Sequence, residues 1–441
     1  MKKSLNKVAT SLFIAVAMTM SACGSDDDLI ETTKIVVPPT ETPSEPKALS
    51  SEDAPVSLEL SPAERQVGVC NNQLAFNLLR KARDSKNSLV LSPLSITCDL
   101  AMLSNGATGE TLRQILQVLG FEHQADMNSF CRKMLTTAAT LDEQTKVLMA
   151  NSIFANTDRG CSLQPDFVAL SKAFYDAELQ SRSFGDGQTL EAINRWASEH
   201  TEGMIEKILT EDEFKSSTLF YLLNAVYFKG GWQMKFDEQL TQMEEFNHAG
   251  NTKELTMRHM MHQQSNYYYY EDEECQMVRL PYGNGNYEMS ILLPREHVGL
   301  DNMAETLTAE RWQQMMQQAM PYPVDLKLPR FKTDSSLGLV NIMKELGMPN
   351  AFEPEKAEFP LFCTCKEPVF ISLMKQVAKL SLDEEGTEAS AVTVIGMANS
   401  CGPGDTSSID YIPFYANRPF LYVISEQTSG AIFFIGQYTG Y

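Results

Sequence analysis

The amino-acid sequence predicts a single large α+β domain with extensive antiparallel sheets. Segments with helical spacing fill most of the first half of the chain, and β-branched or aromatic segments fill most of the second, an order typical of α+β folds. The chain has 441 residues, of which 43% are hydrophobic, which is enough for one large core. No linker divides the chain after about residue 56, so we expect one domain over residues 57–441.

Three helices are expected early in that domain. Residues 63–83 place apolar side chains at helical spacing. A Ser-Pro-Leu-Ser stretch at 92–95 interrupts the pattern, and residues 96–104 then predict a buried helix. Residues 111–119 predict a further short helix. Glycine follows the last two segments closely, as it commonly does just past a helix end.

Strands are expected later in the chain, where residues alternate in polarity or run β-branched and aromatic. The segments with this pattern are 219–228, 267–270, 288–293, 324–328 and 420–424.

The N-terminus predicts export. Lys2 and Lys3 precede an apolar stretch over residues 12–20, which is too short for a comfortable membrane span. Met20-Ser21-Ala22-Cys23 resembles the lipobox of bacterial lipoproteins, in which the cysteine becomes the acylated first residue. This resemblance implies a signal peptide over residues 1–22 and lipidation at Cys23; an ordinary cleaved signal that ends near a cysteine is the alternative.

Residues 23–56 are expected to form a disordered tether, because they are rich in Thr, Pro, Ser and Glu. The acidic run Asp26-Asp27-Asp28 resembles the tract that directs some Gram-negative lipoproteins to the outer face of the outer membrane. We therefore expect a chain anchored to the outer membrane by lipid alone and exposed at the cell surface.

The charge and the histidines exclude several functions. A net charge of −21 argues against a nucleic-acid-binding or anionic-membrane surface. None of the six histidines lies in a nucleophile-elbow, zincin or kinase-like pattern, so no enzyme chemistry is predicted. Residues 281–285 carry turn residues between strands, without the strand-to-helix setting of a phosphate loop.

No metal or other cofactor is expected. His259-Met-Met-His262 and Cys363-Thr-Cys365 are the two candidate metal sites, and neither has the spacing of a familiar zinc site. Nine cysteines are present, but their pairing cannot be read from the sequence.

Four separated segments together resemble the serpin family of serine and cysteine protease inhibitors. They occur in the family's order and cover essentially everything after residue 60. The segments are 87–120, with Ser92-Pro93-Leu94-Ser95-Ile96 and Gly106-Ala107-Thr108-Gly109-Glu110-Thr111; 224–232, Asn-Ala-Val-Tyr-Phe-Lys-Gly-Gly-Trp; 383–391, Asp-Glu-Glu-Gly-Thr-Glu-Ala-Ser-Ala; and Asn417-Arg418-Pro419-Phe420, which continues to 430–436.

The resemblance implies about nine helices, three sheets including a large central one, and an exposed reactive loop near the C-terminus, at about residues 384–412. It places Ser92, Ser95 and Asn224 at the shutter where the central sheet opens, and Trp232 where the loop first enters. A histidine usually completes the shutter, but Gln376 stands at that position. Since glutamine cannot charge near neutral pH, no pH-sensing role is expected there.

The start of the loop has the composition of a strand that can be buried. The family's hinge corresponds here to Glu384, Glu385, Gly386, Thr387, Glu388, Ala389, Ser390 and Ala391. At a period of two, one face carries Thr387, Ala389, Ala391, Thr393 and Ile395, with no charge and no large aromatic ring. No proline, which a central strand would exclude, occurs between 387 and 402.

The resemblance therefore implies an inhibitory serpin, not an enzyme, that acts as a monomer and traps a target protease as a covalent acyl-enzyme. A non-inhibitory serpin-fold surface binding protein is the alternative. The usual family spacing puts the scissile bond at Ser400–Cys401. The segment from there to Asn417 is longer than usual, however, so other bonds remain candidates. The other candidates are Val394, Ile395, Met397, Ala398 and Asn399. No Arg or Lys lies between Lys379 and Arg418, which favours elastase-, chymotrypsin-, subtilisin- or papain-like targets over trypsin-like ones.

Overall fold

The computed structural model describes residues 58–137, 140–248, 255–387 and 410–441. All of them lie within one structural unit, Leu49–Tyr441. The expected signal peptide, Cys23 and the tether lie outside the described residues. So does the stretch 388–409, which contains every candidate for the scissile bond.

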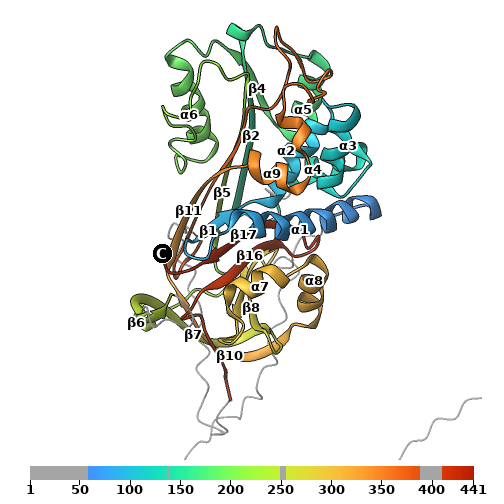
Figure 1. The fold of residues 1–441 in the computed structure, drawn as a ribbon. Helices are drawn as coiled ribbons and strands as arrows, with labels where there is room; N and C mark the ends of the chain where they lie inside the picture. The colour runs from blue at the N-terminus through green and yellow to red at the C-terminus, as the bar shows by residue number, and fades with distance from the viewer. Residues whose placement is uncertain (1–57, 138–139, 249–254, 388–409) are drawn as a thin grey trace, which may run out of the picture. The chain divides into compact units, whose positions relative to one another are not determined.

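Nine α-helices occur in the described ranges (Figure 1). They are α1 (Pro62–Ala82), α2 (Pro93–Ser104), α3 (Gly109–Leu119), α4 (Gln124–Thr136), α5 (Pro165–Tyr175), α6 (Gln188–His200), α7 (Gly299–Thr306), α8 (Ala309–Gln318) and α9 (Val340–Leu346). Three short 3-10 helices are η2 (Thr157–Arg159), η3 (Glu238–Leu240) and η4 (Pro349–Phe352).

Local sequence accounts for where the first helices begin and end. Helix α1 starts at a capping box, in which the Ser61 hydroxyl accepts from the Glu64 N–H and the Glu64 carboxylate accepts from the Ser61 N–H. Helix α3 ends at Gly120, whose φ of 69° suits glycine. The three helices predicted from the sequence are confirmed within a few residues.

A six-stranded sheet has the order β11-β13-β14-β5-β2-β4. Its strands are β11 (Phe331–Gly338), β13 (Leu373–Leu382), β14 (Gly386–Thr387), β5 (Phe220–Gly231), β2 (Thr145–Asn156) and β4 (Glu178–Arg182). Strand β5 is buried almost throughout, because apolar clusters cover both of its faces.

A nine-stranded sheet has the order β1-β17-β16-β9-β8-β7-β10-β15, with β6 also paired to β7. Its strands are β1 (Leu89–Leu91), β6 (Gln242–Asn247), β7 (Leu255–Glu271), β8 (Cys275–Tyr282), β9 (Tyr287–Pro294), β10 (Met320–Pro329), β15 (Ile412–Tyr415), β16 (Phe420–Glu426) and β17 (Ile432–Tyr438). A third sheet pairs β3 (Ser162–Leu163) with β12 (Cys363–Thr364).

The α+β fold class is confirmed, with two differences in detail. Three strand pairs are parallel, β10 with β15, β13 with β5 and β2 with β4, so the sheets are mixed. Strand β7 runs over Leu255–Glu271, far beyond the predicted 267–270, because exposed polar residues interrupt its apolar pattern. The predicted turn at 281–285 does join β8 to β9.

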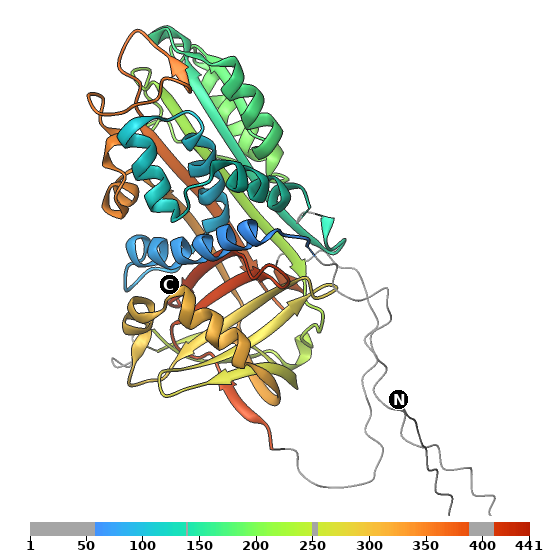
Figure 2. The same ribbon diagram turned by 90° about the vertical axis from the view of Figure 1, so that its right-hand side faces the viewer.

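Helix α2 is buried along its whole length and forms the centre of the core. It contacts α1, α3 and α4 on one side and β2, β5 and β17 on the other. Helix α1 crosses between the long strands of the six-stranded sheet and the nine-stranded sheet (Figure 2). Because α2 packs against β2 and β5, Ser92 and Ser95 at its start lie under the middle of the six-stranded sheet.

Candidate functional site at the seam of the six-stranded sheet

The boundary between β5 and β13, called the seam below, has an unusual strand arrangement. The two strands pair directly and in parallel from Tyr221–Leu373 to Tyr227–Lys379. Beyond that point β14 lies between them and is antiparallel to both. A strand that continued β14 along the seam would therefore be antiparallel to both neighbours, and each of its backbone groups would have a ladder partner.

Strand β14 depends on a glycine. Gly386 pairs with Gly231 and has a φ of 151°, which side chains other than glycine rarely tolerate. A Cβ atom at this position would lie 2.1 Å from the carbonyl oxygen of Gly230. The absence of a side chain at 386 therefore lets the chain enter the seam.

Thr387 is fully buried at the entrance of the seam. Its Oγ1 lies 2.6 Å from the hydroxyl of Tyr282, whose ring stacks on Trp232 with centroids 4.5 Å apart. Burial raises the pKa of Tyr282 above its ordinary value, so the hydroxyl stays protonated and can donate. Thr387 thus faces the core, as the predicted buried face of the hinge requires.

Residues 383–385 hold the start of the hinge against three other segments. Trp232 donates from its backbone N–H to the Glu385 carbonyl at 2.8 Å and from Nε1 to the Asp383 carbonyl at 2.9 Å. The buried Glu384 carboxylate lies 2.5 Å from Arg330 Nε and also accepts from Thr241. These contacts place Trp232 at the end of the seam where β14 enters, the position that its family motif implies.

A buried polar cluster lies under the middle of the seam. Gln376 of β13 donates to Asn224 Oδ1 of β5 at 2.8 Å and to the Ser92 carbonyl at 3.0 Å, and it accepts from the Ser92 N–H at 2.9 Å. Asn224 donates to Ser95 Oγ and to Asn151 Oδ1. The four residues predicted for the shutter, Ser92, Ser95, Asn224 and Gln376, are thus brought into one hydrogen-bonded group.

The hinge itself differs from the sequence expectation. A loop outside the sheet was expected from about Glu384, but Glu384, Gly386 and Thr387 are buried and β14 is already part of the ladder. The glycine at 386 and the Tyr282 partner of Thr387 account for this difference. The remaining hinge residues, Glu388, Ala389, Ser390 and Ala391, lie outside the described residues.

Sequence reasoning missed several residues of the site. Asn151 is a polar residue in the middle of the apolar strand β2, and that isolation was the signal that could have identified it. Its Nδ2 has no hydrogen-bond partner among the described residues. Tyr282 and Arg330 carried no comparable signal, because they meet the hinge only through the fold.

The two candidate metal sites are arranged as follows. His259 and His262 are three residues apart on β7 and therefore point to opposite faces of the strand. Cys161, Cys363 and Cys365 place their sulfur atoms within 4.8 Å of one another, but Cys161 and Cys365 form a disulfide. As it stands, this cluster is a disulfide beside one thiol, and not a set of three thiolate ligands.

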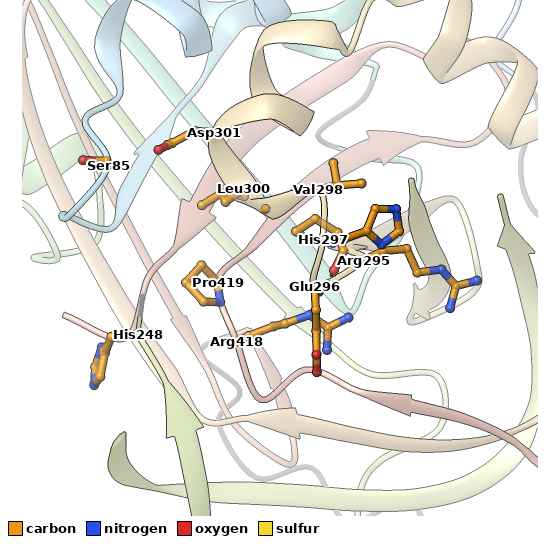
Figure 3. A pocket seen from close by; sticks show the side chains of 12 residues that line it. Ser85, His248, Arg295, Glu296, His297, Val298, Leu300, Asp301, Arg418 and Pro419 are labelled. Atoms are coloured by element: carbon orange, nitrogen blue, oxygen red, sulfur yellow. Dashed lines mark hydrogen bonds between the residues drawn. The ribbon is translucent and has the colours of Figure 1, made fainter. Parts of the chain in front are cut away.

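A cavity of about 230 Å³ lies beside the start of β16 (Figure 3). Figure 3 shows Arg418 and Glu296 next to each other, with Arg295 pointing to the other side. The Arg418 Nε donates to the Pro294 carbonyl at 2.9 Å, and burial lowers the pKa of Arg418. This residue of the Asn417–Phe420 motif therefore ties the segment before β16 to the end of β9.

Comparison with known proteins agrees with this geometry. A family model described as Serpin (serine protease inhibitor) matches residues 70–440. Serpin B6 of Pongo abelii is 31% identical over 382 residues, which cover 84% of this chain and 98% of that protein. Antithrombin-III of Homo sapiens is 28% identical over 385 residues, with 84% of this chain and 81% of that protein covered. The crystal structure of the thermophilic serpin tengpin in its native state superposes with a TM-score of 0.78 at 26% identity, covering 88% of this chain and 97% of tengpin.

Proposed function

The chain belongs to the serpin family, and on that premise we propose that it is an inhibitory serpin that traps a serine or cysteine protease by inserting its reactive loop into the seam. The observation that carries the proposal is the entry of Gly386 and Thr387 between β5 and β13. These two residues of the hinge therefore already occupy the first two positions of the proposed inserted strand.

The register of β14 assigns a partner to each later loop residue. Thr387 is opposite Gly230 on β5 and Leu382 on β13, and each step along the loop moves one residue back along both strands. Thr393 then comes between Asn224 and Gln376, on the same core-facing side as Thr387. Its hydroxyl can replace the hydrogen bond that these two residues now share across the seam.

The same register measures the length of the seam. Residue 396 comes opposite Leu373 and residue 397 opposite Phe220, where the two strands begin. Each added ladder hydrogen bond contributes roughly 0.5–1.5 kcal/mol. With burial of the small side chains, the total over this length rivals the roughly 5–15 kcal/mol stability of a typical domain. Serpin loop insertion is an established example of stored strain released by cleavage.

Trapping then depends on whether the loop inserts faster than water hydrolyses the acyl-enzyme. The protease nucleophile attacks the scissile carbonyl, the peptide bond breaks, and the new amine takes up the proton from the catalytic base. The loop remains esterified to the protease, or thioesterified to a cysteine protease, and its freed strand enters the seam. If insertion distorts the protease active site before water attacks, the complex persists and the inhibitor is consumed.

We place the scissile bond at Ser400–Cys401, just beyond the residues that fill the seam. The lack of basic residues between Lys379 and Arg418 favours elastase-, chymotrypsin-, subtilisin- or papain-like targets. Incubation of the chain from residue 24 onward with an elastase-like protease, followed by a denaturing gel and mass spectrometry, tests both proposals. A band at the summed mass supports trapping, and the released fragment identifies the bond. Cleavage without that band, across a panel that includes papain-like enzymes, would favour the non-inhibitory binding protein.

We further propose that Cys23 carries a lipid anchor that holds the protein on the outer face of the outer membrane. The Met20–Cys23 motif and Asp26–Asp28 support this proposal. No helix among the described residues is long and apolar enough to cross a membrane. Metabolic labelling with a fatty acid should mark the wild type and not Cys23→Ser, and protease added to intact cells should remove the wild-type domain. Labelling of both forms, or full resistance of the domain, would contradict the proposal.

A further inference from the structure

The Cys161–Cys365 disulfide joins segments that flank opposite sides of the seam. Cys161 follows β2, which is paired to β5, and Cys365 precedes β13. These ends of β2 and β13 both lie at the end of the sheet that is farthest from β14. The disulfide is therefore a covalent connection between the two halves of the sheet that the loop has to separate.

Non-covalent contacts reinforce the same connection. Strands β3 and β12 pair Leu163 with Cys363, the Lys366 N–H donates to the Arg159 carbonyl, and Arg159 forms an ion pair with Glu367. A complete inserted strand needs one further strand spacing, about 4.7–4.9 Å, between β5 and β13. A disulfide limits the Cα atoms it joins to roughly 4.4–6.8 Å and so resists their separation.

A third sulfur atom lies within reach of this disulfide. The Sγ of Cys363 is 3.4 Å from the Sγ of Cys365, and the Cys363 side chain is buried. Burial raises the pKa of Cys363 to about 11, so its thiol is protonated and poorly nucleophilic while its surroundings stay closed. An alternative pairing, Cys363 with Cys365 within the Cys-Thr-Cys segment, is thus within reach once Cys363 shifts into line with the Cys161–Cys365 bond.

We propose that Cys161, Cys363 and Cys365 form an exchangeable disulfide clamp that controls how readily the far end of the seam opens. The inference rests on the proposed insertion of the loop into the seam and adds a means of regulating it. With Cys161 and Cys365 joined, the clamp is closed. With Cys363 and Cys365 joined, the disulfide lies within one short segment and the two halves of the sheet are no longer connected covalently.

The exchange needs no external oxidant or reductant. Cys363 loses its proton to water and its thiolate attacks Cys365 Sγ; the Cys363–Cys365 bond forms while the Cys161–Cys365 bond breaks. Cys161 leaves as a thiolate and takes up a proton, so the numbers of thiols and disulfides are unchanged. Separation of β3 from β12 during insertion would expose Cys363 to water and so promote this step.

The test measures insertion without any target protease. A labelled synthetic peptide of residues 388–398, which begins where β14 ends, is mixed with the chain from residue 24 onward, and its incorporation into the seam is followed over time. We expect Cys161→Ser, and wild type after mild reduction, to incorporate the peptide about tenfold faster than oxidised wild type. Cys363→Ser, which keeps the clamp but cannot exchange, should be no faster than wild type. Cys70→Ser, which removes a distant thiol on α1, is the matched control.

Thiol mapping of the same samples gives a second readout, which reports the disulfide pairing directly. After peptide insertion, wild type should contain alkylatable Cys161 and a Cys363–Cys365 disulfide, whereas Cys363→Ser should retain Cys161–Cys365. Equal incorporation rates in all forms, or an intact Cys161–Cys365 bond in inserted wild type, would overturn the clamp without touching the inhibition proposal. Failure of every form to incorporate the peptide would overturn both proposals.

Discussion

Gln376 and Asn224 form a side-chain hydrogen bond of 2.8 Å directly across the seam, between strands that must part for a loop to insert. Both side chains are buried, and Gln376 also exchanges two hydrogen bonds with the Ser92 backbone. The pair therefore holds the sheet closed at its middle, while β14 has already entered at one end. Glutamine makes this contact without a group that titrates near neutral pH.

Removing that contact should make the sheet open more easily. Gln376→Leu keeps a similar volume but leaves the Ser92 backbone groups without their side-chain partner, each at a cost of about 1–3 kcal/mol. We expect a lower thermal midpoint for the native form and faster peptide incorporation. Lys379→Gln, on the same strand but partly exposed, is the control. An unchanged midpoint in Gln376→Leu would show that the contact does not hold the seam.

Thr387→Arg should turn the inhibitor into a substrate. The threonine is fully buried beside Tyr282, and an unpaired guanidinium there would cost several kcal/mol. Insertion would then be slower than hydrolysis of the acyl-enzyme, and the gel should show cleaved inhibitor with free protease. Ser390→Arg, on the opposite face of the predicted strand, is the matched control and should still form complex. A persistent stable complex with Thr387→Arg would refute insertion.

Thr393→Arg tests the register of the inserted strand. If the register of β14 continues, this side chain arrives between Asn224 and Gln376 under the sheet, and its charge is buried there. We expect loss of complex, as with Thr387→Arg, although the first half of the loop is unaltered. Ser390→Arg, three residues earlier on the other face and opposite the partly exposed Lys379 by the same register, should retain inhibition. The reverse order of effects would mean that the register slips by one residue.

Stability should fall with acid through Glu64. Burial raises the pKa of this carboxyl, but hydrogen bonds from Lys133, Ser129 and the Ser61 N–H outweigh burial and lower it to about 2, from 4.5. Because the folded pKa lies below the unfolded one, the carboxylate contributes stability above about pH 4.5 that is lost as the pH falls toward 2. A shift of this size corresponds to roughly 3 kcal/mol.

Glu64→Gln should therefore have a lower thermal midpoint than wild type near neutral pH, and the difference should shrink as the pH is lowered through this window. The exposed Glu122→Gln is the control and should follow wild type throughout. A midpoint difference between Glu64→Gln and wild type that does not depend on pH would contradict this assignment.

Much of the fold was predictable because it depends on residues close together in the chain. The Ser61 capping box, the glycine after α3 and the long apolar run of β5 each define an element locally. Strand β7 was predicted far too short, because exposed polar residues interrupt its apolar pattern. Pairing with β10 and β6 stabilises the rest of the strand. The shutter residues were found through family motifs, whereas Asn151 was overlooked.

Local sequence predicts three of the nine helices in the described residues, several of the main strands and a proline-free stretch of small residues that is able to become a strand. These properties follow from local spacing and side-chain size. The tertiary structure was needed to show that Cys161 pairs with Cys365, 204 residues away in the sequence, that Gly386 and Thr387 are already inside the sheet, and that Asn151 joins the buried cluster under the seam. Such contacts depend on which distant strands become neighbours, and the packing of the whole core decides that.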